Sequence, residues 1–185
     1  KPYIDMTLDV LKSFGIETEF TENTIKISTS DGYISPENYI VEGDWSNGAF
    51  WIVLGALNDG MTIQGLDGNS LQGDKAIVDI LMQMGADITV EQNQVVVGKS
   101  KLDGITVDVS QIPDLAPVLS VALACANGRG KITNASRLKI KESDRLQAIN
   151  DNLVAVGVKT ILGNDSIEIE GKKDIVGGAT QGFND

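Results

Sequence analysis

Basic side chains gather in one short stretch of this acidic chain. Four of its fifteen Lys and Arg residues lie between Arg137 and Arg145, against a formal net charge of −11. Basic and apolar residues alternate from Arg137 to Lys141, which predicts a strand with its cations on one face. Ser143 fits the N-cap of a following helix, whose exposed N–H groups favour anions. We therefore expect Lys139, Lys141 and Arg145 to line one concave anion site, although a solvated basic strand beside an ordinary capped helix would give the same pattern.

Composition narrows the classes of protein that fit this sequence. The hydrophobic content of 42% is enough for a sizeable core, and no apolar run is long enough to cross a bilayer. No signal peptide is expected. The sequence has no histidine, the commonest metal ligand and general base, so no metal site is expected. The single cysteine, Cys125, is expected in the core and excludes a disulfide framework, which fits a reducing, cytoplasmic location. Net acidity argues against a nucleic-acid partner.

The N-terminal segment and the rest of the chain are separated by a polar linker. Tyr3–Phe14 has the pattern of an amphipathic helix, and short strands are expected around Ile16–Phe20 and Thr24–Ser28. Ser30–Asn38, which contains Gly and Pro, is the best candidate for a domain boundary. The strands expected beyond it are Tyr39–Val41, Met61–Gln64, Asp87–Val90, Gln94–Val97, Thr106–Val109, Lys131–Thr133, Thr160–Leu162 and Ser166–Glu170. The helices expected there follow Asp44, Lys75, Asp114 and Ser143.

The same order of elements recurs along the chain. The triplets Phe14-Gly15-Ile16, Met84-Gly85-Ala86 and Val156-Gly157-Val158 are offset by 70 and then 72 residues. Glycine often ends helices, which explains each glycine alone but not a whole unit that recurs in register. The offsets therefore indicate internal repeats of a strand-helix-strand-helix-strand-strand unit.

Five segments of the chain form a set of motifs. They are, in chain order, Glu42-Gly43-Asp44-Trp45-Ser46, Gly68-Asn69-Ser70-Leu71-Gln72-Gly73-Asp74, Ile112-Pro113-Asp114, the basic stretch Lys139-Ile140-Lys141-Glu142-Ser143-Asp144-Arg145-Leu146, and Gly182-Phe183-Asn184-Asp185. This set resembles, in family order, the motifs of the EPSP synthases, which make 5-enolpyruvylshikimate 3-phosphate. The basic stretch resembles the second signature of that family.

The resemblance implies an α/β fold (α+β) of repeated βαβαββ units, with helices inside and sheets outside, an inside-out α/β barrel. Family members have two domains of three such units each. Residues 1–36 are then expected to be the tail of one domain, and residues 37–185 two full units of the other with the opening strand of a third near Ala179–Phe183. The second domain of the same enzyme is the expected partner. The N-terminal helix is expected to pack against 116–126 and 146–156, within one chain or by exchange between two chains, burying Leu8, Leu11 and Phe14.

The family reaction moves the enolpyruvyl group of phosphoenolpyruvate onto the 5-hydroxyl of shikimate 3-phosphate, without a metal or organic cofactor. By resemblance, Asp114 takes the hydroxyl proton, Lys141 bridges the hydroxyl and the intermediate, and Glu142 donates or relays a proton to the methylene carbon. Arg145 clamps phosphoenolpyruvate, because guanidinium binds carboxylate or phosphate bidentately. Tyr3 lines the site of the shikimate phosphate. The implied catalytic residues are thus Asp114, Glu142 and Lys141, and the implied substrate-binding residues Asp114, Lys141, Arg145 and Tyr3.

Each of these residues also has an ordinary structural explanation. Asp114 suits a helix N-cap and Lys141 a solvated strand. Glu142 suits the first turn of a helix, where the helix dipole favours a negative charge. Asp144 is expected to orient Lys141 or Arg145 rather than to react.

Two other functions compete with the first one. The sister enzyme that transfers enolpyruvate to UDP-N-acetylglucosamine shares the fold, but the Lys-Glu-Ser-Asp-Arg element speaks against it. A non-catalytic, repeat-built domain could instead use the basic stretch to bind anions. The family's N-terminal lysine and arginines, and its final His-Arg and lysine, are not in this sequence, so the 185 residues alone are expected to be inactive.

Overall fold

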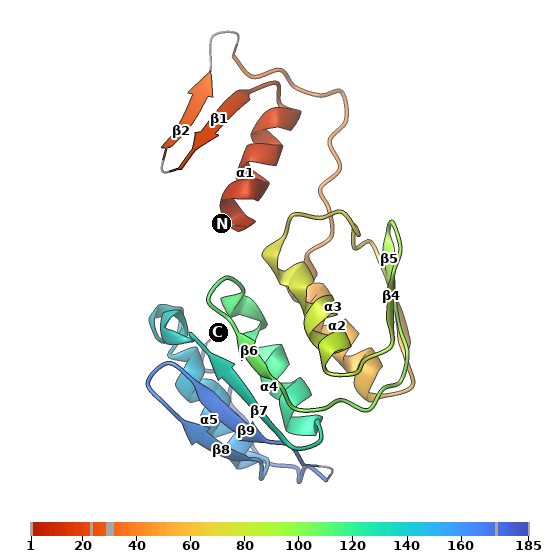
Figure 1. Ribbon diagram of the computed structural model, residues 1–185, viewed down its shortest axis with the longest axis vertical. Coiled ribbons are helices and arrows are strands. Elements are labelled where there is room, and N and C mark those ends of the chain that lie inside the picture. Colours follow the sequence, from red (N-terminus) through yellow and green to blue (C-terminus); the bar gives the residue numbers. More distant parts are fainter. Residues whose placement is uncertain (1, 23, 29–31, 173, 185) are drawn as a thin grey trace.

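A computed structural model describes residues 2–22, 24–28, 32–172 and 174–184. It has a small N-terminal part and a larger part, drawn at the top and bottom of Figure 1. The small part contains one helix and an antiparallel hairpin: α1 (Pro2–Ser13), β1 (Glu17–Thr21) and β2 (Thr24–Ser28). Residues 32–44 connect the two parts without regular secondary structure.

The larger part begins with a helix, a three-stranded antiparallel sheet and a second helix. The strand order in the sheet is β3-β5-β4. The elements in chain order are α2 (Trp45–Leu57), β3 (Met61–Gln64), the 3₁₀ turn η1 (Gly73–Ala76), α3 (Ile77–Gln83), β4 (Ile88–Val90) and β5 (Gln94–Val97).

A second unit follows, built around a four-stranded mixed sheet. Its strand order is β6-β7-β9-β8, with β6 parallel to β7 and the other pairs antiparallel. The elements are β6 (Thr106–Asp108), η2 (Pro113–Leu115), α4 (Ala116–Cys125), β7 (Arg129–Thr133), η3 (Ser136–Ile140), α5 (Arg145–Ala155), β8 (Lys159–Leu162) and β9 (Ile167–Glu170). The order of its main helices and strands is the βαβαββ unit that the repeat offsets predict.

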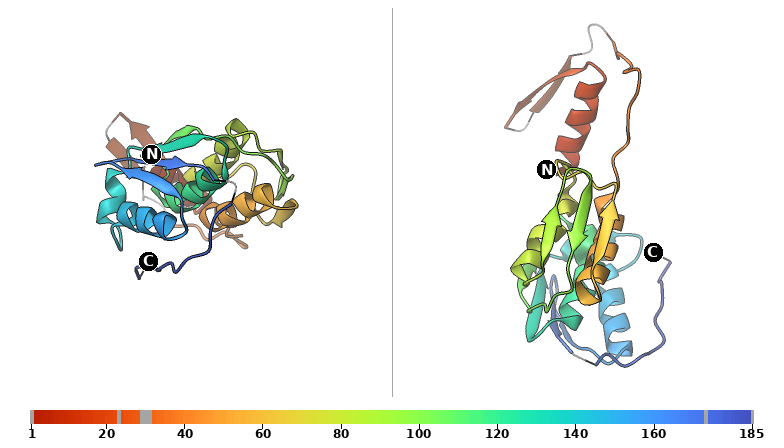
Figure 2. Two further views of the ribbon diagram at one scale, coloured as in Figure 1. Left: turned by 90° about the horizontal axis from the view of Figure 1, so that it is seen from below. Right: turned by 90° about the vertical axis from the view of Figure 1, so that its right-hand side faces the viewer.

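Helices α2 and α4 form the centre of the core. Both are apolar around most of their circumference, a composition typical of helices covered on several sides. Ile52 of α2 and Leu119 and Leu123 of α4 are fully buried. The left view of Figure 2 shows the sheets along one side of this part and α2 and α5 along the opposite side, with α4 between them. The mixed α/β fold with helices packed inside its sheets is therefore as expected.

Three expected strands are absent from the described residues: the basic stretch 137–141, which is described with the site below, and residues 39–41 and 179–183. Residues 39–41 lie in the connecting segment, where Ile40 and Val41 are 90% and 82% exposed. Two adjacent apolar residues point to opposite faces of a strand, and here neither face is covered. Residues 179–183 are also irregular, because Gln181 exchanges backbone hydrogen bonds with the Asn152 side chain of α5 (2.9 Å each) rather than with another strand.

The expected packing of the N-terminal helix is wrong. None of the described residues of α1 is buried, and Leu8, Leu11 and Phe14 are only partly covered. The reason is that α1 packs against its own strand β1, and the Phe14 ring lies 5.4 Å from that of Tyr39 in the connecting segment. Cys125, expected in the core, is likewise only partly buried.

Within the described residues, no helix combines the length and apolar character needed to span a membrane. The same part of the chain contains no cluster of acidic or cysteine side chains suited to a metal ion.

Strand β7 packs closely on α4 because Gly130 has no side chain. A Cβ atom at Gly130 would lie 2.4 Å from Leu123 Cδ2. We expect Gly130→Ala to destabilise the fold by about 1–3 kcal/mol, because Leu123 is fully buried and has little room to move. Chemical denaturation of the two proteins measures the difference. Gly177→Ala is the matched control, since no atom lies within 4 Å of its Cβ position; equal stability of the two variants would contradict the packing argument.

Candidate active site

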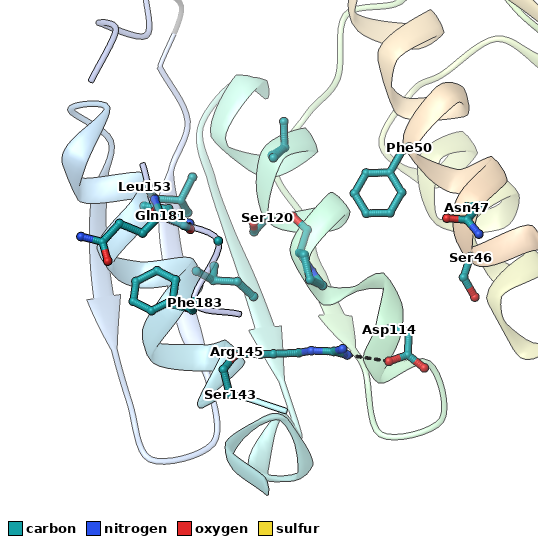
Figure 3. A pocket seen from close by; sticks show the side chains of 16 residues that line it. Ser46, Asn47, Phe50, Asp114, Ser120, Ser143, Arg145, Leu153, Gln181 and Phe183 are labelled. Carbon is teal, nitrogen blue, oxygen red and sulfur yellow. Dashed lines mark hydrogen bonds and ion pairs between the residues drawn. The ribbon is translucent and has the colours of Figure 1, made fainter. Parts of the chain in front are cut away.

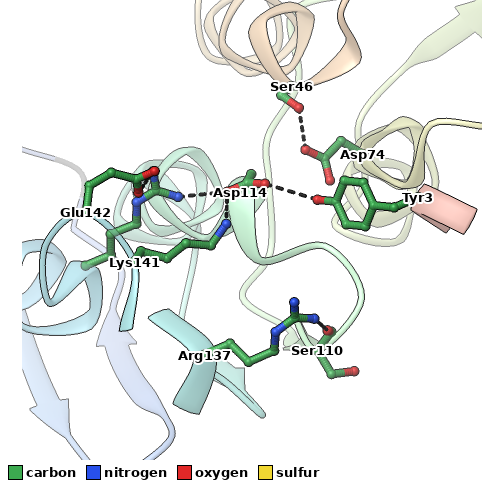
Figure 4. A network of polar contacts seen from close by, with 9 residues as sticks. Tyr3, Ser46, Asp74, Ser110, Asp114, Arg137, Lys141 and Glu142 are labelled. Atoms are coloured by element: carbon green, nitrogen blue, oxygen red, sulfur yellow. Dashed lines mark hydrogen bonds and ion pairs between the residues drawn. The ribbon is translucent and has the colours of Figure 1, made fainter. Parts of the chain in front are cut away.

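The Asp114 carboxylate is the centre of the polar cluster in Figure 4. It lies in η2, the 3₁₀ turn that follows β6 and leads into α4. Its Oδ1 accepts hydrogen bonds from Lys141 Nζ at 3.0 Å and from Arg145 Nη1 at 2.7 Å. Its Oδ2 accepts one from the Tyr3 hydroxyl at 3.1 Å. The structure therefore brings together four of the five residues that the sequence singles out, from segments up to 142 positions apart.

The basic stretch does not form the expected strand. Residues 136–140 are the 3₁₀ turn η3, and only Lys141 after it is extended. Leu138 is fully buried whereas Ile140 is 83% exposed, so the two apolar residues do not share a face. Alternation over so few residues fits a short helical turn as well as a strand. Lys139 is exposed, and neither Lys139 nor Lys141 lines the cavity beside Arg145, so the expected concave site holds one of its three expected cations.

The helix that carries Arg145 begins one residue later than expected. Asp144, not Ser143, is the N-cap of α5, and its carboxylate accepts a hydrogen bond from Gln147 N at 3.1 Å. Asp144 thus sets the start of the helix, which makes Arg145 its first residue. This position turns the guanidinium toward η2 and Asp114, as Figure 3 shows.

The fifth singled-out residue, Glu142, joins the cluster through Arg145. Arg145 Nη2 donates to Glu142 Oε2 at 2.9 Å, while Nη1 contacts Asp114. The Arg145 side chain is 17% exposed, whereas that of Glu142 is 61% exposed. One guanidinium is therefore held between an inner and an outer carboxylate. The cluster contains two cations and two carboxylates, so its charges balance.

Two ionisation equilibria are displaced at this site. Burial of Asp114 disfavours its charged form, but the hydrogen bonds from Lys141 and Arg145 outweigh that effect and lower the pKa of the carboxyl. The pKa of Tyr3 is raised to about 12, first by burial and then by the neighbouring Asp114 charge. At neutral pH the site therefore holds an ionised Asp114 and a protonated Tyr3 that donates to it.

A cavity of about 580 Å³ opens beside Arg145 and Asp114. Figure 3 shows Phe50 of α2 on one side of it, and Leu153 of α5 with Phe183 of the C-terminal segment on the opposite side. The polar cluster lies at one end of this largely apolar space. The arrangement can hold an anion at Arg145 and remove or return a proton at Asp114.

Two polar residues near the site were not assigned a role from sequence. Ser46 of α2 donates a hydrogen bond to Asp74 of η1 at 2.6 Å, and both residues line a smaller cavity of about 190 Å³ next to Asp114. Both belong to motifs similar to family elements, which was the available signal. Nothing in the local spacing indicates that these two motifs meet in space.

Comparison with known proteins identifies the family. The family model described as EPSP synthase (3-phosphoshikimate 1-carboxyvinyltransferase) matches residues 1–185. This chain belongs to the EPSP synthase family. The 3-phosphoshikimate 1-carboxyvinyltransferase of Clostridium kluyveri is 42% identical over 185 residues, which are 100% of this chain and 43% of the relative. The chain thus spans less than half the length of the curated relatives it matches.

Solved structures agree with this assignment. The EPSP synthase of Acinetobacter baumannii superposes with a TM-score of 0.79 at 31% identity, over 89% of this chain and 40% of that one. The enolpyruvyl transferase NikO of Streptomyces tendae superposes with a TM-score of 0.71 at 19% identity, over 92% and 40%, which supports the fold alone.

The Asp114 cluster should make stability depend on pH. Because the folded-state pKa of Asp114 is lowered, its contribution is complete above the unfolded pKa of about 4 and is lost as pH falls through the folded value. We expect Asp114→Asn to cost about 1–3 kcal/mol at pH 7, since Lys141 and Arg145 lose the negative charge of their shared acceptor, and less at pH 3. Urea denaturation at both pH values measures this. Asp59→Asn, which breaks the exposed pair with Lys99, is the control and should change little. A pH-independent effect of Asp114→Asn would contradict the assignment.

Proposed function

We propose that this chain supplies part of the active site of a 3-phosphoshikimate 1-carboxyvinyltransferase. The reaction transfers the enolpyruvyl group from phosphoenolpyruvate to the 5-hydroxyl of shikimate 3-phosphate and releases phosphate. The observation that supports it best is the convergence of Lys141, Arg145 and Tyr3 on Asp114 in a member of the EPSP synthase family. Both substrates are polyanions, and the cluster offers cations beside a carboxylate.

Asp114 is the proposed base for the 5-hydroxyl. It is ionised at neutral pH and can accept a proton, and Lys141 at 3.0 Å can stabilise the alkoxide that forms. Tyr3, protonated at neutral pH, is a hydrogen-bond donor suited to the acceptor substrate and its phosphate. These three groups therefore face the substrate that gives up a proton.

Arg145 and Glu142 are the proposed residues for the second substrate. The guanidinium is a planar fork that fits a carboxylate or phosphate, and phosphoenolpyruvate carries both. Its present partners, Asp114 and Glu142, occupy the donors that the substrate would take. Glu142 is more exposed, so it can leave Arg145, take up a proton from solvent and pass that proton to the methylene carbon.

We also propose that residues 1–36 and 37–185 belong to different domains of the enzyme. The irregular connection at 32–44 and the self-contained helix and hairpin before it support this division. Asp185 of the C-terminal motif and Ser30 of the expected linker lie outside the described residues. A cytoplasmic location is part of the same proposal, and fractionation of the source cells tests it.

The activity can be tested in a chimera in which residues 1–185 replace the matching segment of the Clostridium kluyveri relative. We expect phosphate release that depends on both substrates. Asp114→Asn should lower kcat by about 100- to 10,000-fold, the range for loss of a general base. Circular dichroism confirms folding of each protein. A folded chimera without transfer, or one indifferent to Asp114→Asn, would refute the proposal.

The 185 residues alone should show no measurable transfer. Holding two substrates at reacting distance supplies roughly 7–11 kcal/mol of barrier lowering, and one side of a site does not provide it. Isothermal calorimetry should detect at most weak phosphoenolpyruvate binding, abolished by Arg145→Ala. Arg129→Ala is the matched control, because Arg129 pairs with Glu170 in the β7–β9 sheet away from the cluster. Transfer by the isolated chain that Asp114→Asn removes would overturn this expectation.

A further inference from the structure

The loop 68–73 fixes a carboxyl group beside the candidate active site. Gln72 connects this loop to the start of α2: its Oε1 accepts from Trp45 N at 2.9 Å and its Nε2 donates to Gly43 O at 2.8 Å. Asp74 follows at the beginning of η1, so the loop sets its position relative to α2. The result is contact between Asp74 Oδ2 and the Ser46 hydroxyl at 2.6 Å.

Asp74 is unusual in its burial and in its lack of partners. It is 5% exposed and is the one Asp, Glu, Lys or Arg residue in the buried class among the described residues. Its Oδ1 is buried and has no hydrogen-bond partner in the same part of the chain. No ion pair of Asp74 occurs there either, although a buried carboxylate normally requires one.

The surroundings of Asp74 are rich in negative charge. The cavity of about 190 Å³ that it lines is also lined by Asp44 and Asp114, with Tyr3 on the α1 side. Lys141 is the cation whose field reaches Asp74, but its ammonium already pairs with Asp114. An ionised Asp74 would therefore be a third carboxylate in one small space, without a cation of its own.

We propose that Asp74 is a positioning residue that works as a neutral carboxyl group. Its Oδ2 fixes Ser46 at the start of α2, and a proton on its buried Oδ1 keeps a second negative charge out of the space beside Asp114. It acts through Ser46 and Asp114 rather than by touching the reacting atoms. The effect of Asp74 on catalysis rests on the proposed function, whereas the protonation of Asp74 does not.

The ionisation of Asp74 agrees with this geometry. Burial raises its pKa, the Ser46 hydrogen bond opposes that shift, and the nearby Asp114 and Asp44 charges raise the pKa further. Asp114 is displaced in the opposite direction by its two cations. Two carboxyl groups in one site whose pKa values are pushed apart are suited to different tasks, one to hold a proton and the other to accept one.

A titration of the isolated chain tests the protonation directly. With ¹³C-labelled aspartate, the Asp74 carboxyl carbon is assigned by its loss in Asp74→Asn, and the Asp114 carbon by its loss in Asp114→Asn. We expect Asp74 to stay protonated to a higher pH than every other aspartate, and Asp114 to titrate below the usual range. An Asp74 that titrates with the exposed aspartates, or below them, would overturn the proposal whether or not the protein is an enolpyruvyl transferase.

Kinetics of the chimera test the consequence. Asp74→Asn keeps a neutral side chain with an oxygen that can accept from Ser46, so kcat/KM should stay within about threefold of the parent, with its alkaline limb moved to higher pH. Asp74→Ala should lose about 10- to 100-fold, because the Ser46 hydroxyl loses its acceptor and a void is left beside Asp114. Equal losses of kcat/KM in both variants would contradict the proposal that Asp74 works in its protonated form. A pH profile of kcat/KM that Asp74→Asn does not shift would contradict it as well. An inactive parent chimera refutes the proposed function alone, and the titration then decides the state of Asp74.

Discussion

The short contact between Arg145 and Asp114 joins the elements on which the site depends. Arg145 opens α5, Asp114 precedes α4, and Tyr3, the third partner, belongs to α1. Exposed ion pairs contribute little to stability, but the ion-paired side chains of Lys141, Arg145 and Asp114 are only 17–30% exposed. Loss of one charge here would leave its partner partly desolvated. The cluster thus sets the position of two helix starts and of the N-terminal tyrosine together.

The apolar helices explain why the polar cluster lies where it does. One face of α2 and of α4 packs on the sheets, and the remaining apolar side chains, such as Phe50 and Val121, line the larger cavity. The N-terminal ends of the helices carry polar residues, and these residues lie together at one rim of that cavity. Charged groups at this rim face a space of low polarity, where electrostatic interactions are stronger than in water.

Much of the fold follows from local sequence. Gly85 and Gly157 adopt φ values of 100° and 81° after α3 and α5, a conformation that favours glycine, so the spacing of such residues marks the ends of repeated helices. The strand β5 has the bounds that its apolar pattern predicts. The 3₁₀ turn at 136–140 was missed because its alternation of basic and apolar residues has no local feature that separates it from a strand.

Some residues of the site can be recognised only from the tertiary contacts that they make in the folded chain. Motif resemblance gave Asp114, Lys141 and Arg145, and the structure places them within hydrogen-bonding distance. Asp74 could not be found in this way, because its character comes from burial against α2, which is remote in sequence. An aspartate in a turn is ordinarily solvated and ionised, and the contact with Ser46 and the proximity of Asp114 become visible only in three dimensions.

The two cations bound to Asp114 determine when this carboxylate can act as a base. With Lys141 and Arg145 both bound, Asp114 has a lowered pKa and little tendency to take a proton. An anion that binds Arg145 competes with Asp114 for the guanidinium and removes one of the two stabilising charges. The basicity of Asp114 then rises only when the second substrate is present. In the proposed reaction, binding of phosphoenolpyruvate would thus raise the pKa of Asp114 before it deprotonates the hydroxyl. A neutral Asp74 would add no negative charge of its own to the field at Asp114.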